Sequence, residues 1–335
     1  MAISDGLYAR ASKKMEEQSY QLKGQWFFKS DACEACGVSN RPEHKDYREA
    51  IGQVLYNWVH LKKPVLEQQG KRYRFIIKEF KIIKPGNPEG KRFEMSWPRG
   101  IKDNSSFGFA DTLVITKGDV IGLGGEGNKG KSCFALNLAV ENMDKHKVTL
   151  ILSENIQRLD ERLSHFDWVN IFTPEGDWKF EAIEARSDRE FLDIVRERKD
   201  NLVIIDWLNV SKDAYLVSNF YEALTNILGD GVAVAVQQKR SYKDYVVGGE
   251  AALDFSSVFF YLMENKISVA KAKVWDYQNP NNTMFHFDII KNGSQFSSIF
   301  EIMDCPQCKG KETYRGDTCG RCYGKGYLEK REEFQ

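Results

Sequence analysis

Residues 125–132 read Gly125-Glu126-Gly127-Asn128-Lys129-Gly130-Lys131-Ser132, directly after the strand-like run at 118–122. This is the G-x-x-x-x-G-K-S spacing of a P-loop, in which glycines let successive backbone N–H groups turn toward phosphate oxygens. The helix that follows points its positive end at the same phosphates. The spacing predicts a site for a nucleoside triphosphate such as ATP.

Three residues at the end of this loop have separate expected roles. Lys131 would place a positive charge on the β- and γ-phosphates, and Ser132 would ligate Mg²⁺. Cys133 begins the run of the following helix. The expected nucleotide contacts therefore extend from residue 125 to residue 133.

A second pattern overlaps the loop. Residues 122–127 also fit G-x-G-x-x-G, the fingerprint of dinucleotide-binding folds. That shorter pattern is weak alone, and residues 130–132 have no role in it. The P-loop is therefore the favoured interpretation.

Apolar runs and amphipathic helical patterns alternate through the middle of the chain. Such alternation predicts an α/β fold with a mainly parallel sheet covered by helices on both faces. We expect strands at 118–123, 148–153, 202–206 and 232–237, and helices at 130–143, 155–165 and 218–229.

Polar residues follow these strands, at the edge where a parallel sheet gathers its functional groups. Asp206 would hold Mg²⁺ opposite Ser132, although a strand-end aspartate can also cap a helix. Glu154 could orient and deprotonate the water that attacks the γ-phosphate. Gln238 or its neighbour Gln237 could sense that phosphate, or either could be an ordinary surface residue.

The stretch from about Trp97 to Asp304 resembles the RecA, RadA and DnaB group of oligomeric P-loop ATPases, especially helicase-like members of replicons and phages. The matching segments are 121–139, 153–154, 158–163, 204–206, 236–240 and 248–250. The resemblance implies a RecA-like core that uses ATP and Mg²⁺ and assembles into a ring or filament. It also implies single-stranded DNA as a partner, in the cytoplasm of a bacterial cell or a phage-infected host.

In that family a basic residue from a neighbouring subunit completes the catalytic site, a role that the resemblance implies for Lys291. The sequence departs from the family pattern nearby, because Gly293 stands where DnaB-like helicases usually carry an arginine. Arg240 or Lys273 could supply the charge instead, or the residue is missing and hydrolysis is weakened. The segment 242–247 is a candidate for the loop that lines a central channel.

The N-terminal third predicts two helices with a common core. Asp31 can cap a short helix that turns Cys33 and Cys36 inward, and Gly37 can end it. A longer helix is expected at about 43–60, with these apolar residues on one face: Tyr47, Ile51, Val54, Leu55 and Trp58. A zinc site at the two cysteines is the alternative, but no second pair of ligands lies at suitable spacing.

Residues 64–76 predict two strands around a glycine turn. Together with the two helices they resemble a winged helix, which implies contact with nucleic acid or docking to a protein. The candidate contacts on the longer helix and on the wing are Lys45, Arg48, Gln53, Lys71, Arg72 and Arg74.

Four cysteines near the C-terminus form two C-x-x-C turns, Cys305 with Cys308 and Cys319 with Cys322. That spacing predicts a tetrahedral four-thiolate Zn²⁺ site with a structural role. The second half, C-x-x-C-x-G-x-G, resembles DnaJ-type zinc fingers, and the first half departs from it. Basic residues around the site could contact nucleic acid or another protein.

The 335 residues carry 48 Lys and Arg and 48 Asp and Glu, so the formal net charge is zero. Cations exceed anions by seven in residues 1–100, whereas anions exceed cations by eight in residues 101–302. A basic N-terminal third suits a polyanionic partner, although a merely solvated surface is the plain alternative. Without a leader pattern, a ~20-residue apolar run or a disulfide framework, we expect an intracellular protein that does not contact membranes.

These patterns divide the chain into a winged-helix-like domain (1–78), a linker (79–98), a RecA-like ATPase domain (99–302) and a zinc-binding module (303–335). We expect a nucleic-acid-dependent ATP hydrolase, with a helicase-like DNA motor of replication or DNA processing as the leading function. An ATP-gated DNA-binding switch and a RadA-like recombination or repair ATPase are the alternatives.

Overall fold

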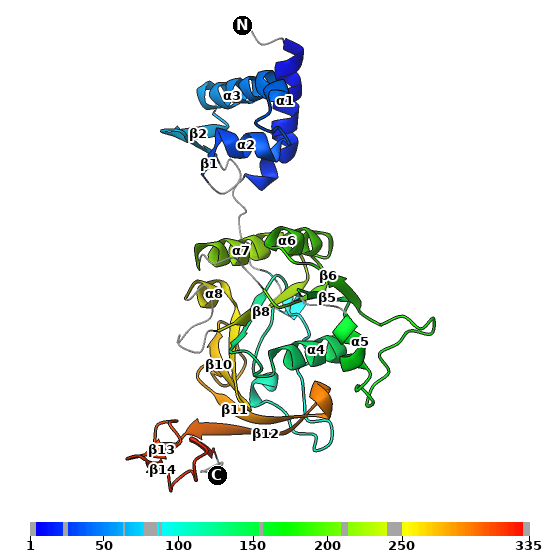
Figure 1. The fold of residues 1–335 in the computed structure, drawn as a ribbon, viewed down its shortest axis with the longest axis vertical. Coiled ribbons are helices and arrows are strands. Elements are labelled where there is room, and N and C mark those ends of the chain that lie inside the picture. The colour runs from blue at the N-terminus through cyan, green and yellow to red at the C-terminus, as the bar shows by residue number, and fades with distance from the viewer. Residues whose placement is uncertain are drawn as a thin grey trace. The chain divides into compact units, whose positions relative to one another are not determined.

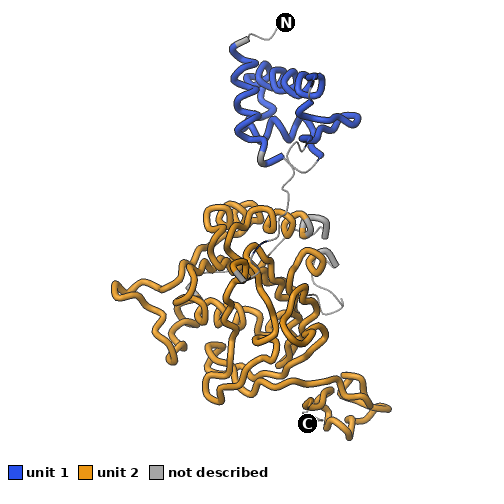
Figure 2. Tube along the Cα trace, turned by 180° about the vertical axis from the view of Figure 1, so that it is seen from behind, with its two compact units in different colours: residues 1–86 blue, residues 87–335 orange. Residues whose placement is uncertain are grey.

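The computed structural model describes residues 5–22, 26–62, 64–76, 86, 89–153, 157–208, 214–239 and 250–330. The chain divides into two compact units, residues 1–86 and residues 87–335 (Figure 2). Each unit has a hydrophobic core of its own. Among the described helices, none combines the length and the apolar character needed to cross a membrane.

The described residues of the first unit form three α-helices and a small antiparallel sheet (Figure 1). Along the chain the elements are α1 (Asp5–Gln18), β1 (Phe27–Phe28), α2 (Lys29–Ala35), α3 (Lys45–His60), β2 (Leu66–Gln69) and β3 (Arg72–Phe75). In the sheet, β3 lies between β1 and β2.

Asp31 caps α2 and Gly37 follows its end, as predicted from the sequence. The carboxylate of Asp31 accepts a 2.7 Å hydrogen bond from the backbone N–H of Phe28 at the start of α2, and Gly37 takes a left-handed φ of 66° after the helix ends. Cys33 and Cys36 are buried in the core with one face of α3. The predicted structural role of these cysteines thus agrees with their burial.

The second unit is built on a ten-stranded, mostly parallel sheet. The strands are β4 (Val120–Gly125), β5 (Val148–Leu152), β6 (Glu181–Glu184), β7 (Leu202–Asp206), β8 (Val232–Gln238), β9 (Val258–Met263), β10 (Lys266–Ala272), β11 (Met284–Ile290), β12 (Gln295–Asp304) and β15 (Tyr327–Glu329). Their order is β15-β12-β11-β10-β9-β4-β8-β7-β5-β6, with parallel pairing from β6 to β9 and antiparallel pairing from β9 to β15. A separate hairpin joins β13 (Thr313–Tyr314) and β14 (Asp317–Thr318).

Helices cover both faces of the parallel strands (Figure 1). On one face lie α4 (Lys131–Asn142) and α5 (Gln157–Leu163), and on the other lie α6 (Asp188–Glu197), α7 (Ala214–Ile227) and α8 (Glu250–Phe255). Side chains alternate between the faces, so Leu202 and Ile204 pack on the α4 side while Val203 and Ile205 pack on the α6–α8 side. This alternation decides which face each strand-end residue takes.

The predicted α/β architecture is confirmed, with shifts of a few residues at the element ends. The parallel strands β6 and β9 and the antiparallel strands β10, β11, β12 and β15 were not foreseen. The last of these follows the C-terminal cysteines along the chain, so the cysteine-rich segment contributes a strand to the main sheet.

Candidate nucleotide and metal sites

The glycine-rich loop connects the carboxyl end of β4 to the start of α4. Asn128 and Gly130 have left-handed φ values of 59° and 85°. A Cβ atom at Gly130 would lie 2.5 Å from the side chain of Ile289, and a Cβ at Gly125 would collide with the carbonyl oxygen of Leu262. Gly125 is therefore required by the close approach of the β9 backbone, and Gly130 by its left-handed conformation in the turn.

Lys131 is the first residue of α4 and is 9% exposed. Its ammonium group donates a hydrogen bond to the carbonyl oxygen of Glu126 within the loop. Burial lowers the pKa of Lys131, while Asp206 and Glu126 act in the opposite direction. The lysine thus holds a poorly solvated positive charge beside the glycine-rich turn, which suits an anionic ligand.

Ser132 and Asp206 meet at the carboxyl edge of the sheet. The hydroxyl of Ser132 donates to Oδ1 of Asp206 at 3.2 Å. Asp206 ends β7 on the same face as Leu202 and Ile204, which brings it under the start of α4. Its peptide bond to Trp207 is cis. A hydroxyl and a carboxylate are oxygen ligands of the kind Mg²⁺ prefers, so these two residues fit the predicted cation.

The two glutamines at the end of β8 lie on opposite faces. Gln238 pairs in register with Gly125, and its amide nitrogen would lie 3.5 Å from a Cβ placed on Gly127. Gln237 is buried on the other face, where its amide oxygen has no hydrogen-bond partner among the described residues. Gln238 is therefore the glutamine that adjoins the loop.

Several predicted site residues are placed elsewhere or cannot be placed. Glu154, Arg240 and the segment 242–247 lie outside the described residues. Lys273 follows β10, where its backbone N–H donates to Ser257 ahead of β9, at the edge of the sheet opposite to the P-loop. Lys273 therefore does not reach the loop of its own chain.

Lys291 is engaged within its own chain. Its ammonium donates to Oδ2 of Asp167 at 2.6 Å, and this hydrogen bond holds the pKa of the Asp167 carboxyl below its usual value. Gly293, with a φ of 93°, lies against the first turn of α4, where a Cβ would be 2.6 Å from the sulfur of Cys133. The glycine that departs from the DnaB-like pattern thus fits a position with no room for a side chain. The sequence analysis did not identify Asp167 as the partner of Lys291.

The four C-terminal cysteines form one buried cluster. Their sulfur atoms all lie within 4.8 Å of one another, and within the described part of the chain no other group of three or more His, Cys, Asp and Glu residues is placed to hold a metal. Four thiols at this separation could hold a tetrahedral zinc ion. Burial raises the pKa of Cys305, but hydrogen bonds from the backbone N–H groups of Cys308 and Gln307 and with the side chains of Cys308 and Cys319 together lower it to about 7.

The two halves of the cysteine cluster share a backbone pattern. Lys309 and Tyr323 have φ values of 50° and 51°, and the glycines that follow them, at 310 and 324, have 79° and 77°. Glu312 takes the place of Gly326 with a φ of 65° against 76°. The first half therefore keeps the loop of the second half although it lacks the second glycine.

Two of the side chains of α3 that were predicted to contact nucleic acid form hydrogen bonds within the first unit. Arg48 donates from Nη1 to the carbonyl oxygens of Ser39 and Arg41, at 2.7 Å each. Gln53 donates to Asn57 at 2.8 Å. On the hairpin, Lys71, Arg72 and Arg74 are exposed.

No protein-family model matches the chain, and a comparison with curated proteins finds no relative. The function must therefore be argued from the fold and from the residues that the fold brings together. Those residues are Lys131, Ser132 and Asp206 at the sheet edge and the cysteine cluster near the C-terminus.

Proposed function

We propose that the second unit is a RecA-like P-loop ATPase core that binds ATP with Mg²⁺. The proposal rests on one observation above all, the 3.2 Å contact of Ser132 with Asp206 beside the buried ammonium of Lys131. If the glycine spacing were accidental, we would expect Lys131 to be exposed, and we would not expect Asp206 of a distant strand to contact Ser132.

Each residue then has a defined task. Lys131 binds the β- and γ-phosphates, while Ser132 and Asp206 hold Mg²⁺, which neutralises charge on those phosphates. Glu154 would orient the attacking water and accept its proton. Gln238, beside Gly127, would contact the γ-phosphate and transmit its presence to the chain that follows. A zinc ion at the four cysteines would have a structural role, since all four ligands come from the protein.

We further propose that the first unit is a winged helix and that the ATPase acts on DNA as an oligomeric, helicase-like motor. Support for the winged helix comes from the element order α1-β1-α2-α3-β2-β3 and from the central place of β3 in the sheet. The basic N-terminal third provides charge complementarity to DNA.

One observation favours a second candidate, an ATP-gated DNA-binding switch that does not unwind. Lys291, the first choice for a residue that completes a neighbour's site, forms an ion pair with Asp167 of its own chain. If that pair persists in the assembly, no cation from this segment reaches the neighbouring site and hydrolysis is slow.

The decisive test is ATP hydrolysis by zinc-replete protein, alone and with single-stranded DNA, duplex DNA or RNA. Lys131→Ala should abolish turnover. Lys179→Ala, which removes an ion-paired lysine remote from the loop, is the matched control and should not. Stimulation by single strands supports the motor. ATP binding with slow turnover that ignores every nucleic acid supports the switch, and absence of ATP binding refutes both.

A further inference from the structure

The sheet of the first unit has one face in the core. Phe27 and Phe75 point inward, with their ring centroids 5.7 Å apart, and the ring of Trp58 from α3 lies 6.0 Å from that of Phe75. Tyr73 lies beside them, 6.1 Å from Phe27. Helix α3 therefore closes this inner face.

The opposite face carries exposed aromatic rings, each paired with an arginine. The guanidinium carbon of Arg72 lies 5.9 Å from the ring centre of Phe28, and that of Arg74 lies 5.2 Å from the ring centre of Trp26. Phe28 is 47% exposed and Trp26 is 36% exposed. We refer to Trp26, Phe28, Arg72 and Arg74 as the outer aromatic face.

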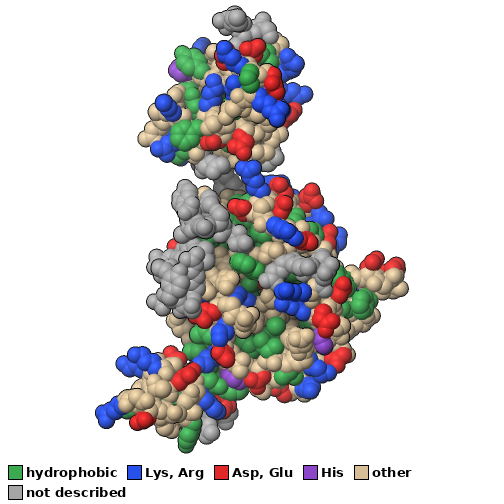
Figure 3. All heavy atoms as spheres, viewed as in Figure 1, with side chains coloured by type: hydrophobic (Ala, Val, Ile, Leu, Met, Phe, Trp, Pro, Cys, Tyr) green, Lys and Arg blue, Asp and Glu red, His purple; other side chains and the backbone are tan. Residues whose placement is uncertain are grey.

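This face has an excess of positive charge. Arg74 is paired with Glu67 of β2. Among the described residues, neither Arg72 nor the adjacent Lys71 has an acidic partner. In the view of Figure 3, hydrophobic and basic side chains lie next to one another on the first unit. A second copy of the same face would bring like charges together, which disfavours self-association through it.

The chemistry of the face matches a single-stranded nucleic acid. Unpaired bases stack on aromatic rings and on guanidinium planes, while the backbone phosphates attract arginine and lysine. The two aromatic–arginine pairs are two residues apart along the strands, about 7 Å, so neighbouring bases could each use one. A duplex keeps its base faces stacked inside and cannot use these rings.

We propose that the outer aromatic face binds single-stranded nucleic acid, with bases stacked on Trp26 and Phe28 and phosphates beside Lys71 and Arg72. The site is thus the sheet and not α3, where Arg48 and Gln53 are engaged in hydrogen bonds within the unit. The inference deepens the nucleic-acid part of the proposed function and needs neither ATP nor hydrolysis.

Photo-cross-linking locates the site directly. The full-length, zinc-replete protein is irradiated without nucleotide in the presence of an oligothymidine that carries 5-iodo-deoxyuridine, and the adducts are mapped by mass spectrometry. We expect adducts at Trp26 or Phe28, with an RNA oligomer as a second arm and a duplex as the negative control. Adducts confined to α3 or to the second unit, or no adduct at all, overturn the proposal.

Affinity measurements on variants provide the independent test. Trp26→Ala and Phe28→Ala should each weaken binding of the oligothymidine about tenfold, whereas Tyr56→Ala removes a more exposed ring of α3 and should not. Circular dichroism confirms that each variant is folded. A loss seen only in Lys45→Ala assigns binding to α3 and refutes the proposal. Because ATP is absent throughout, failure of the ATPase assay leaves this result standing, and the reverse also holds.

Discussion

At the scale of single residues, the P-loop lysine and the strand-end aspartate have opposite charges that meet in a poorly hydrated place. Asp206 is buried and accepts a hydrogen bond from the hydroxyl of Ser132. A carboxylate in this position stabilises a bound cation through its charge, and asparagine keeps the shape but not the charge.

Asp206→Asn should therefore lower the rate of ATP hydrolysis about 100-fold or more, because Mg²⁺ loses its carboxylate. The measurement is steady-state turnover across a range of magnesium concentrations. Asp230→Asn is the control, since Asp230 pairs with Lys117 near the opposite edge of the sheet. Equal rates in the two variants would contradict the assignment of Asp206 to the metal.

The Lys291–Asp167 pair makes a prediction about protonation. Lys291→Met should raise the pKa of Asp167 toward its ordinary value, because the hydrogen bond from Lys291 is the main cause of its low pKa. Carbon-detected NMR titration of the carboxyl measures this.

The sign of the accompanying pH dependence follows from linkage. A carboxyl whose folded pKa lies below its unfolded value contributes stability above the unfolded pKa of about 3.9 and loses it as the pH falls through the folded pKa. Below about pH 4, the free energy of unfolding of Lys291→Met should therefore fall less steeply than that of the unsubstituted protein. An unchanged Asp167 pKa would show that the ion pair is not populated in solution.

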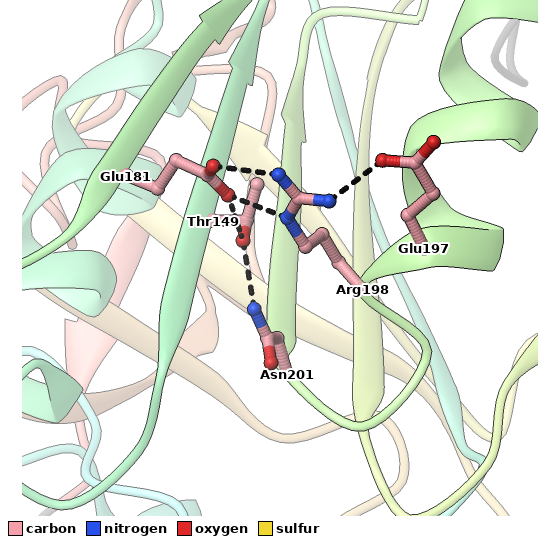
Figure 4. Close-up of polar contacts among 5 residues, drawn as sticks. All are labelled: Thr149, Glu181, Glu197, Arg198 and Asn201. Carbon is pink, nitrogen blue, oxygen red and sulfur yellow. Dashed lines mark hydrogen bonds and ion pairs between the residues drawn. The ribbon is translucent and has the colours of Figure 1, made fainter.

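At the scale of elements, a polar cluster ties the outermost parallel strand to its neighbours. Arg198 donates two hydrogen bonds, of 2.8 and 2.9 Å, to Glu181 of β6, and the hydroxyl of Thr149 donates a third of 3.1 Å (Figure 4). The same hydroxyl accepts from Asn201 at 3.0 Å. The cluster lies at the amino ends of β5 and β6, away from the P-loop.

Thr149→Val should lower the free energy of unfolding by about 1 kcal/mol, because it leaves an acceptor and a donor without their shared partner. Thr225→Val is the matched control: Thr225 is an exposed residue, and its hydroxyl donates to the carbonyl oxygen of Tyr221 in the same helix. Urea unfolding measures both. ATP turnover should be the same in both variants, since neither residue lies at the site.

The segment around the four C-terminal cysteines is the element whose folding we expect to depend most on a ligand. Removing zinc with a chelator should greatly increase amide hydrogen exchange over residues 305–330, because four thiols alone do not hold such a small core. Exchange in the first unit and in β4 to β8 should not change. Cys319→Ser should lose the metal, and Cys33→Ala should retain it. Retention of zinc by Cys319→Ser would argue against the four-cysteine site.

The sequence predicted those elements whose signals are local. Glycine spacing predicts the P-loop and the start of α4. Continuous apolar runs predict the strands that end at Asp206 and Gln238. In two of the antiparallel strands a bulge interrupts the alternation that marks a strand: one lies in β10 between Val269 and Lys271, and the other lies in β12 between Ser297 and Phe300.

The site was only partly predictable for a related reason. The meeting of Ser132 with Asp206 follows from a motif, whereas the ion pair of Lys291 with Asp167 joins residues 124 positions apart in the sequence. The choice between Gln237 and Gln238 depends on which face each takes. Val232, Val234 and Val236 pack on the α4 face, and the same alternation brings Gln238 to it.

At the scale of the whole molecule, the two units have separate cores, so each should respond to its own ligand. Mg²⁺ with a non-hydrolysable ATP analogue at 100 times its dissociation constant should stabilise the second unit by about 2.7 kcal/mol and leave the first unit unchanged. Differential scanning calorimetry should show two transitions, of which only one moves. In Lys131→Ala neither should move. A single transition that shifts as a whole would show that the units unfold together.

The short strand β15 affects how readily the chain could aggregate. Both edge strands of the large sheet are short, three residues in β15 and four in β6, and short edges offer little template for pairing with another chain. Behind β15 lies β12, which has ten residues and pairs with β15 only at positions 302–304. With zinc at the four cysteines, as proposed above, loss of the metal would remove this cover and expose a longer edge. Metal supply would then govern aggregation and turnover of the protein as well as the order of its C-terminal segment.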